Sequence, residues 1–163
     1  MNRKALQVIR DEHATLAAML RSLIQMVRRG PEPEGRDEHE LYFDVLRAML
    51  FYIDEFPEKL HHPKETELLF PRIAQASPEV ADAIAQLDRD HDVGESRVRQ
   101  LMHLLMAWEY LGDTRRQAFE DAATQYVDFY LKHMSLEESV VLPAAEKSLS
   151  EDDLHALNAA FAT

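Results

Sequence analysis

The sequence predicts an all-α protein, an antiparallel up-and-down four-helix bundle with a short extra C-terminal helix. Apolar residues recur at alternating three- and four-residue spacing, the period of helices that pack against other helices. Only 4 glycines occur in 163 residues, and Leu, Ala, Glu and Arg are abundant, as helices favour. A chain of this length suits one domain, which we expect to span residues 1–163.

The first two helical regions differ in regularity. The first is expected to end at Gly30-Pro31, which opens the polar segment PEPEGRDE, and its stripe holds one histidine among Leu6, Ile9, His13, Leu16, Leu20, Leu23 and Val27. The second region, from about residue 38 to 76, is apolar over a wider arc. Pro57 and Pro63 each remove a backbone donor there, so we expect a kink or break.

The third helix is expected to start at Ser77-Pro78, with Ser77 as its cap and the proline at the first helical position. His91 falls on its apolar face, and Trp108 is expected in the core. A histidine on this face is polar where the pattern calls for an apolar residue. It is therefore a candidate for a specific role.

The fourth helix is predicted to be capped by Asp113, and both His133 and Glu137 face inward on it. Tyr126 and Tyr130 share this face; either hydroxyl could hydrogen-bond a ligand, and ordinary core packing explains them equally well. A short last helix after residue 150 is expected to close over the bundle.

Composition excludes several classes of function. A formal net charge of -12 argues against binding to nucleic acid or anionic lipid, and no segment is apolar enough for a membrane span. The sequence has no cysteine, so any metal must bind through nitrogen and oxygen ligands. The same absence favours a reducing, cytoplasmic location.

One internal repeat carries the chemistry. HHPKETELLFP at residues 61–71 and HMSLEESVVLP at residues 133–143 share the frame His-x3-Glu-x5-Pro. A histidine and a glutamate four residues apart can both reach one metal ion, and the carboxylate can bridge two ions. A single such pair is weak evidence, since pairs arise by chance and most lone histidines on helix faces are packing residues. Inward histidines on all four helices, with glutamates on two, favour a metal site jointly.

At these motifs the chain resembles the hemerythrin-like, or HHE cation-binding, family. The resemblance rests on DEH at 11–13, FPEKLHHPKETELLFP at 56–71, RDHDVG at 89–94 and FYLKHMSLEESVVLPAAEKSLSEDDL at 129–154. It implies a non-heme centre of two iron ions bridged by an oxo or hydroxo group. By the resemblance, His13 and His61 bind one iron, His91 and His133 bind the other, and Glu65 and Glu137 bridge them. His62 is expected to complete the second iron.

The chain departs from oxygen-carrying hemerythrins, which have His-x3-His on the third helix and His-x4-Asp on the fourth. Here the third helix has His91-x3-Glu95, and Glu95 lies one position off the apolar face. We therefore expect Glu95 to be solvated, while leaving open whether it or His62 completes the second iron. Glu138 is expected to face solvent, and three further histidines are taken as surface or packing residues: His39, His103 and His155.

Three functions remain open at this point. The first is a module that binds or senses O2, NO or iron itself. The second is an oxidoreductase that acts on peroxide or repairs nitrosative or oxidative damage. The third is a helical bundle that holds zinc or manganese, or has no physiological metal.

Overall fold

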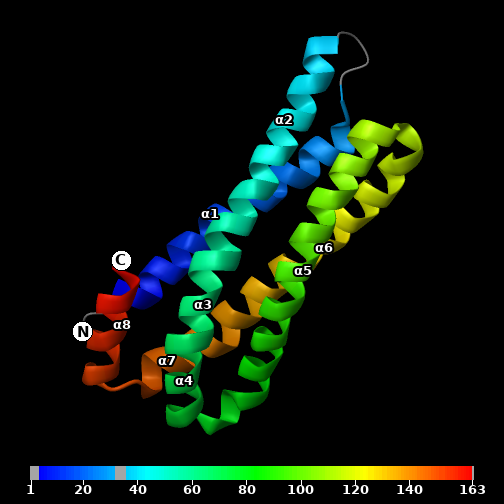
Figure 1. Cartoon of the computed structure of the whole chain (residues 1–163). Helices are drawn as coiled ribbons and strands as arrows, with labels where there is room; N and C mark the ends of the chain where they lie inside the picture. The colour runs from blue at the N-terminus through cyan, green and yellow to red at the C-terminus, as the bar shows by residue number, and fades with distance from the viewer. Residues whose placement is uncertain (1–3, 32–35, 163) are drawn as a thin grey trace.

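The computed structural model describes residues 4–31 and 36–162. Within these residues the chain forms four long helical rods and a short last helix, with no strand. Successive rods run in opposite directions, so the bundle is up-and-down (Figure 1). The predicted all-α bundle with an extra C-terminal helix is confirmed.

The first two rods are joined through the polar segment, of which residues 32–35 lie outside the described part of the chain. The first rod is α1 (Lys4–Arg29). It ends where predicted, because Gly30 adopts a φ of 72° and its N–H bonds to the carbonyl of Met26 at 2.9 Å. The second rod is built from α2 (Arg36–Ile53), a π-helical turn (Asp54–His61), α3 (His62–Lys64), a second π-helical turn (Glu65–Leu69) and α4 (Phe70–Ala76).

The other two rods complete the bundle. The third is a 3-10 turn (Pro78–Val80) followed by α5 (Ala81–Leu111). The fourth consists of a 3-10 turn (Asp113–Arg115), α6 (Arg116–Leu136), a π-helical turn (Glu137–Val141) and α7 (Leu142–Ser148). The last helix, α8 (Glu151–Phe161), is capped by the Ser150 side chain, which accepts from the N–H of Asp153 at 3.1 Å. It lies beside the start of α1, near both ends of the chain (Figure 1).

Of the kink or break expected at Pro57 and Pro63, a break does not occur, because the second rod stays helical and widens into π-helical turns. In each π-helical turn the residue before a proline bonds to the carbonyl five residues back: His62 to Pro57, Phe70 to Glu65, and Leu142 to Glu137. A proline lacks an N–H, and its ring collides with the carbonyl four residues back in an α-helix. One wider turn relieves that collision. The repeated His-x3-Glu-x5-Pro frame therefore places a π-helical turn at each glutamate.

One of the two predicted helix caps is wrong. Ser77 stands at the cap position with Pro78 after it, as predicted, but its side chain makes no capping bond and its hydroxyl donates to the Ser148 hydroxyl at 2.5 Å. Asp113 does not cap the fourth rod, where Gly112 stands at the cap position and the Asp113 carboxylate accepts from the indole N–H of Trp108 at 3.0 Å. Trp108 is buried, as expected, and a buried indole needs such an acceptor.

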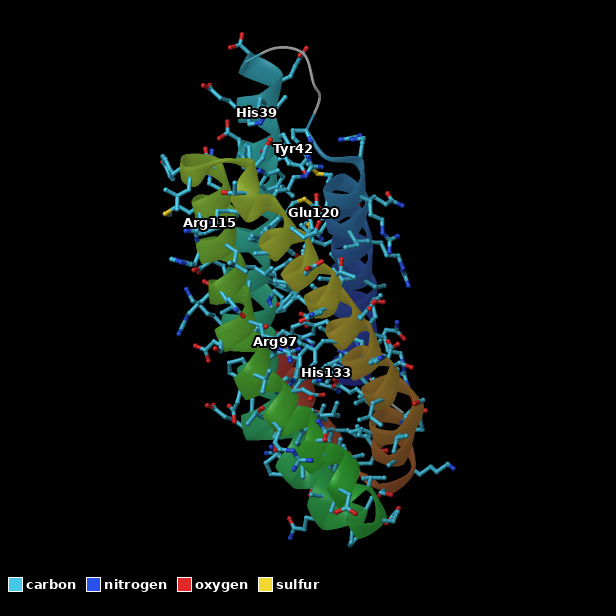
Figure 2. All side chains as sticks on the ribbon, turned by 90° about the vertical axis from the view of Figure 1, so that its right-hand side faces the viewer. His39, Tyr42, Arg97, Arg115, Glu120 and His133 are labelled. Carbon is cyan, nitrogen blue, oxygen red and sulfur yellow. The ribbon has the colours of Figure 1, made fainter. Side chains whose placement is uncertain are left out.

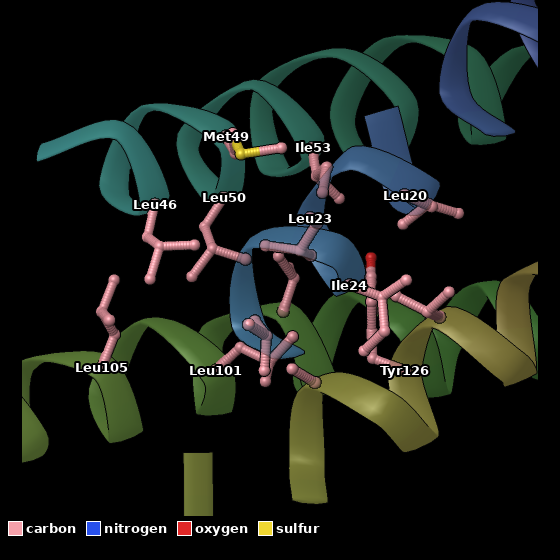
Figure 3. Close-up of a cluster of buried hydrophobic side chains, with 14 of the residues drawn as sticks. Leu20, Leu23, Ile24, Leu46, Met49, Leu50, Ile53, Leu101, Leu105 and Tyr126 are labelled. Carbon is pink, nitrogen blue, oxygen red and sulfur yellow. The ribbon is translucent and has the colours of Figure 1, made fainter. Parts of the chain in front are cut away.

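The apolar core forms two separate clusters along the bundle. One packs α1, α2, α5 and α6 together through Leu20, Leu23, Leu46, Leu50, Leu101 and Tyr126, among others (Figure 3). The other joins the first turns of α1 to α4, α7 and α8. Each rod passes from one cluster to the other, and the inward residues in between are polar. None of the helices in residues 4–31 and 36–162 is both long and apolar enough to cross a membrane.

Candidate metal centre

The polar layer between the two apolar clusters consists of the seven residues singled out in the sequence. Each is buried, with at most 7% of its surface exposed: His13, His61, His62, Glu65, His91, His133 and Glu137. His13 comes from α1 and His91 from α5, whereas the remaining five stand at or beside the π-helical turns of the second and fourth rods. Figure 2 shows His133 at this level, far along α6 from Glu120.

The seven residues contain two groups that could each hold a metal ion. Candidate ligand atoms of His13, His61 and Glu65 all lie within 4.8 Å of one another. The same holds for one atom each of His62, His91 and His133. His61 and His62 are adjacent in sequence yet belong to different groups, since successive residues of a helix point about 100° apart.

Glu65 lies between the two groups. Its Oε1 is 2.8 Å from Nε2 of His61 in one group and 3.6 Å from Nε2 of His91 in the other. The side chain is fully buried. A carboxylate in this position can contact an ion in either group.

Glu137 lies between the groups in the same way. Its Oε2 is 3.5 Å from Nε2 of His13 and 3.8 Å from Nε2 of His133. The two copies of the repeated frame thus each supply one carboxylate between the same two histidine groups.

The Nδ1 atoms of the five histidines face oxygen atoms outside the two groups. Their partners are Glu138 for His13, Glu12 for His61, Glu58 and Tyr130 for His62, Thr66 for His91, and Asp90 for His133. The Thr66 and Asp90 contacts are 2.8 and 3.1 Å, whereas that of Glu138 is 3.5 Å. His13 Nδ1 makes no hydrogen bond at that distance. A hydrogen-bond partner at Nδ1, such as Thr66 for His91 or Asp90 for His133, fixes the ring and leaves Nε2 available to a metal ion.

Most of these partners were not found from the sequence. Glu12 precedes His13 in the sequence but contacts Nδ1 of His61 on another helix. Asp90 likewise precedes His91 but contacts Nδ1 of His133. Glu58 lies four residues before His62, the same spacing that separates histidine and glutamate in the repeated frame. That spacing could have indicated Glu58 as a partner of His62. No sequence pattern indicates Thr66 as a partner of His91.

The inward atoms of the layer are buried without a hydrogen-bond partner anywhere in residues 4–31 and 36–162. They are Nε2 of His61, His91 and His133 and both carboxylate oxygens of Glu65 and Glu137. Burying an unpaired polar atom costs about 1–3 kcal/mol. Metal ions between the groups would relieve this cost for several atoms at once, so the donor set fits a metal centre.

Electrostatics keep the histidines nearest each other neutral. Burial, reinforced by His91, His61 and His133, holds the pKa of His62 well below its usual value. Burial and the neighbouring histidines likewise lower the pKa of His91 to about 4, although Glu65 opposes them. Neutral imidazole is the form that binds metal ions.

His61 and Glu65 form a charged pair in the absence of an ion. Burial alone would lower the pKa of His61, but Glu65 and Glu12 outweigh it and raise that pKa to about 10. Burial would raise the pKa of Glu65, yet His61 above all lowers it to about 2.

The alternative ligand Glu95 lies away from the two groups. Its side chain is half-exposed and accepts a hydrogen bond from Arg99 at 2.6 Å. His62, in contrast, groups with His91 and His133. Glu138 is exposed, as expected, but also reaches His13. The other three histidines, His39, His103 and His155, are exposed.

A surface groove of about 540 Å³ reaches the layer beside His13. It runs between α1 and the fourth rod, where small residues face each other: Ala14, Ala17, Ser135 and Ser139. Arg21 and Glu138 also line it. The groove offers small molecules an approach to one end of the layer.

The hemerythrin HHE cation-binding domain model matches residues 4–145, which include all seven residues of the layer. No curated protein matches the chain. Residues 146–163, including α8, lie beyond the matched range.

Glu137→Leu is expected to abolish binding of at least one metal ion without destabilising the metal-free protein. Both carboxylate oxygens are buried and unpaired, and replacing such a group by an apolar one of similar size is often neutral or stabilising. Metal titration and urea unfolding of the metal-free protein would measure the two effects. The matched control is Glu67→Leu, an exposed glutamate in the π-helical turn of the second rod, which should retain metal. A metal-free Glu137→Leu protein less stable by 2 kcal/mol or more would indicate a structural glutamate.

Each bound metal ion is expected to raise the free energy of unfolding by about 2.7 kcal/mol when free metal is at a hundred times its dissociation constant. The total gain should fall in His61→Ala and persist in His155→Ala, because only His61 belongs to the buried layer. Thermal or urea unfolding with and without metal gives the values. Equal gains in both variants would contradict the assignment of the layer.

Proposed function

Because the chain belongs to the hemerythrin HHE cation-binding family, we propose that it is a non-heme di-iron protein that binds or senses O2, NO or iron itself. The observation that carries the proposal is the position of Glu65 and Glu137, each between the same two groups of histidines. Two carboxylates in such positions suit two metal ions better than one.

In this proposal His13 and His61 hold one iron, while His62, His91 and His133 hold the other. Glu65 and Glu137 bridge the two. Nitrogen and carboxylate donors without thiolate suit iron, and manganese or zinc would accept the same set. Ferrous ions held by this donor set would supply open coordination positions for O2, NO or peroxide.

The two ions would differ in their protein ligands. With both glutamates shared, the ion beside His13 has two histidines, whereas the other has three. The first ion therefore keeps one more position open for a small molecule. The groove that ends at His13 lies on this side, which supports entry of the small molecule there.

We further propose that residues 1–163 act as one hemerythrin-like domain. The helix α8 lies beyond the matched residues, but its Leu154, Leu157 and Phe161 belong to the same apolar cluster as the start of α1. A cytoplasmic location is part of the proposal and is supported by the lack of cysteine.

Anaerobic loading with ferrous iron is expected to give two iron ions per chain. Absorption spectra recorded before and after O2, NO or peroxide would then separate the candidate functions. Reversible spectral change with O2 or NO supports binding or sensing, whereas rapid consumption of peroxide supports the oxidoreductase alternative. Less than one iron per chain, or preferential retention of zinc or manganese, would refute the di-iron proposal.

Ala14→Phe is expected to slow NO association with the iron-loaded protein several-fold, because Ala14 lines the groove beside His13. Iron content should stay the same. Stopped-flow absorption measures the rate, and Ala18→Phe, an exposed position on α1 outside the groove lining, serves as the control. Equal rates in the two variants would show that small molecules enter elsewhere.

A further inference from the structure

A buried carboxylate outside the proposed ligand set lies against His62. Glu58 stands in the π-helical turn one helical turn before His62, and its side chain is 1% exposed. Its Oε1 accepts hydrogen bonds from the hydroxyls of Tyr126, at 3.2 Å, and Tyr130. Its Oε2 lies 3.5 Å from Nδ1 of His62, and the Tyr130 hydroxyl lies 3.4 Å from the same nitrogen.

Glu58 differs from the other carboxylates that face histidine Nδ1 atoms in the described chain. The side chains of Asp90, Glu12 and Glu138 are 12%, 26% and 42% exposed, so water can solvate their charge. Glu58 has no such access, and an isolated buried carboxylate is costly. The two tyrosine hydroxyls compensate by donating to it.

Gly94 makes room for this arrangement. A Cβ atom at this position would lie 2.2 Å from the hydroxyl oxygen and 2.9 Å from Cζ of Tyr130, and 3.0 Å from Oε1 of Glu58. The two distances to Tyr130 are shorter than real Cβ contacts, and the distance to Glu58 is tight. Any larger residue on α5 at this point would therefore separate Tyr130 from Glu58.

The ring of His62 is held in a fixed plane. It stacks on His91 with a centroid distance of 4.2 Å and an interplanar angle of 12°, and its plane is within 11° of that of Tyr130 at 5.4 Å. Stacking fixes the plane of the ring, and Glu58 and Tyr130 lie against Nδ1. Nε2 is therefore the nitrogen that remains available to a metal ion.

We propose that Glu58, Tyr126 and Tyr130, in the space left by Gly94, are positioning residues that make His62 a ligand of the ion held by His91 and His133. The inference rests on the proposed di-iron function. The Tyr130 hydroxyl, 3.4 Å from Nδ1 of His62, and Oε2 of Glu58, 3.5 Å from it, face the Nδ1–H in this arrangement, so the ring is oriented with its Nε2 lone pair free for the ion.

The same residues explain how the bundle supplies a third histidine to this ion. On α5 only His91 reaches the site, because Gly94 has no side chain and Glu95 is paired with Arg99 at the surface. The second rod provides the missing imidazole instead. The glycine that offers no ligand on α5 creates the space that the positioning residues of His62 need.

The test is a titration of metal-free protein with ferrous iron under anaerobic conditions, with a competing chelator to resolve two affinities. Wild-type protein should take up two ions. Glu58→Leu should weaken one of them by roughly 10- to 100-fold and leave the other unchanged. Glu58→Gln, which keeps an acceptor for Nδ1–H, should lose less. Tyr130→Phe and Gly94→Ala should weaken the same ion several-fold.

A double-mutant cycle distinguishes positioning from a general structural role. In a His62→Ala background, Glu58→Leu should cause no further loss of affinity, because the residue it positions is gone. Tyr42→Phe is the matched control, since this buried hydroxyl bonds to the Met26 carbonyl away from the layer. Circular dichroism of each metal-free variant checks the fold, and Tyr130→Phe, which keeps the ring, carries the test if Glu58→Leu does not fold.

A spectroscopic measurement is independent of affinity. In the Co²⁺-loaded protein, Tyr130→Phe should speed solvent exchange of the His62 Nδ1 proton while leaving the corresponding proton of His133 unchanged. Additive losses in the cycle, equal weakening of both ions, or unchanged exchange would each overturn the inference. Wild-type uptake of fewer than two ions would instead refute the proposed function, so the two failures are distinguishable.

Discussion

The structure depends on a buried layer of imidazoles and carboxylates whose inward atoms have no hydrogen-bond partner in the described part of the chain. At about 1–3 kcal/mol for each such atom, the seven inward atoms together cost on the order of 10 kcal/mol. That is comparable to the whole net stability of a domain, roughly 5–15 kcal/mol. Charged pairs such as His61 with Glu65 offset part of it. The layer therefore makes physical sense as a metal centre, with an apolar cluster on either side of it along the bundle.

Proline governs where the layer forms. Both carboxylates that lie between the histidine groups begin π-helical turns, and each turn is closed by the N–H of the residue before a proline. The widened turns lie at the level of the metal centre, where they let several polar side chains of one rod face inward. The prolines of the repeated frame thus shape both the helical rods and the candidate metal site.

Periodicity predicted much of this arrangement and left the rest undetermined. The apolar spacing located α1, α5 and α6, and the inward positions of His13, His91 and His133 followed from it. Spacing does not fix the rotation of one helix against another, so it could not show that Glu65 reaches His91 or that Glu58 meets Tyr130 from 72 residues away. The predicted cap at Asp113 failed because its carboxylate bonds to the Trp108 indole five residues earlier, and Ser77 stands at its predicted position but bonds to Ser148 on another rod.

The central claim is that two ions share this layer. Anomalous X-ray diffraction at the iron absorption edge, on crystals of the iron-loaded protein, tests it most directly. The account predicts two iron peaks, one against His13, His61 and Glu65 and the other against His62, His91 and His133, with Glu137 beside both. A single peak, or iron bound only outside the layer, would contradict it.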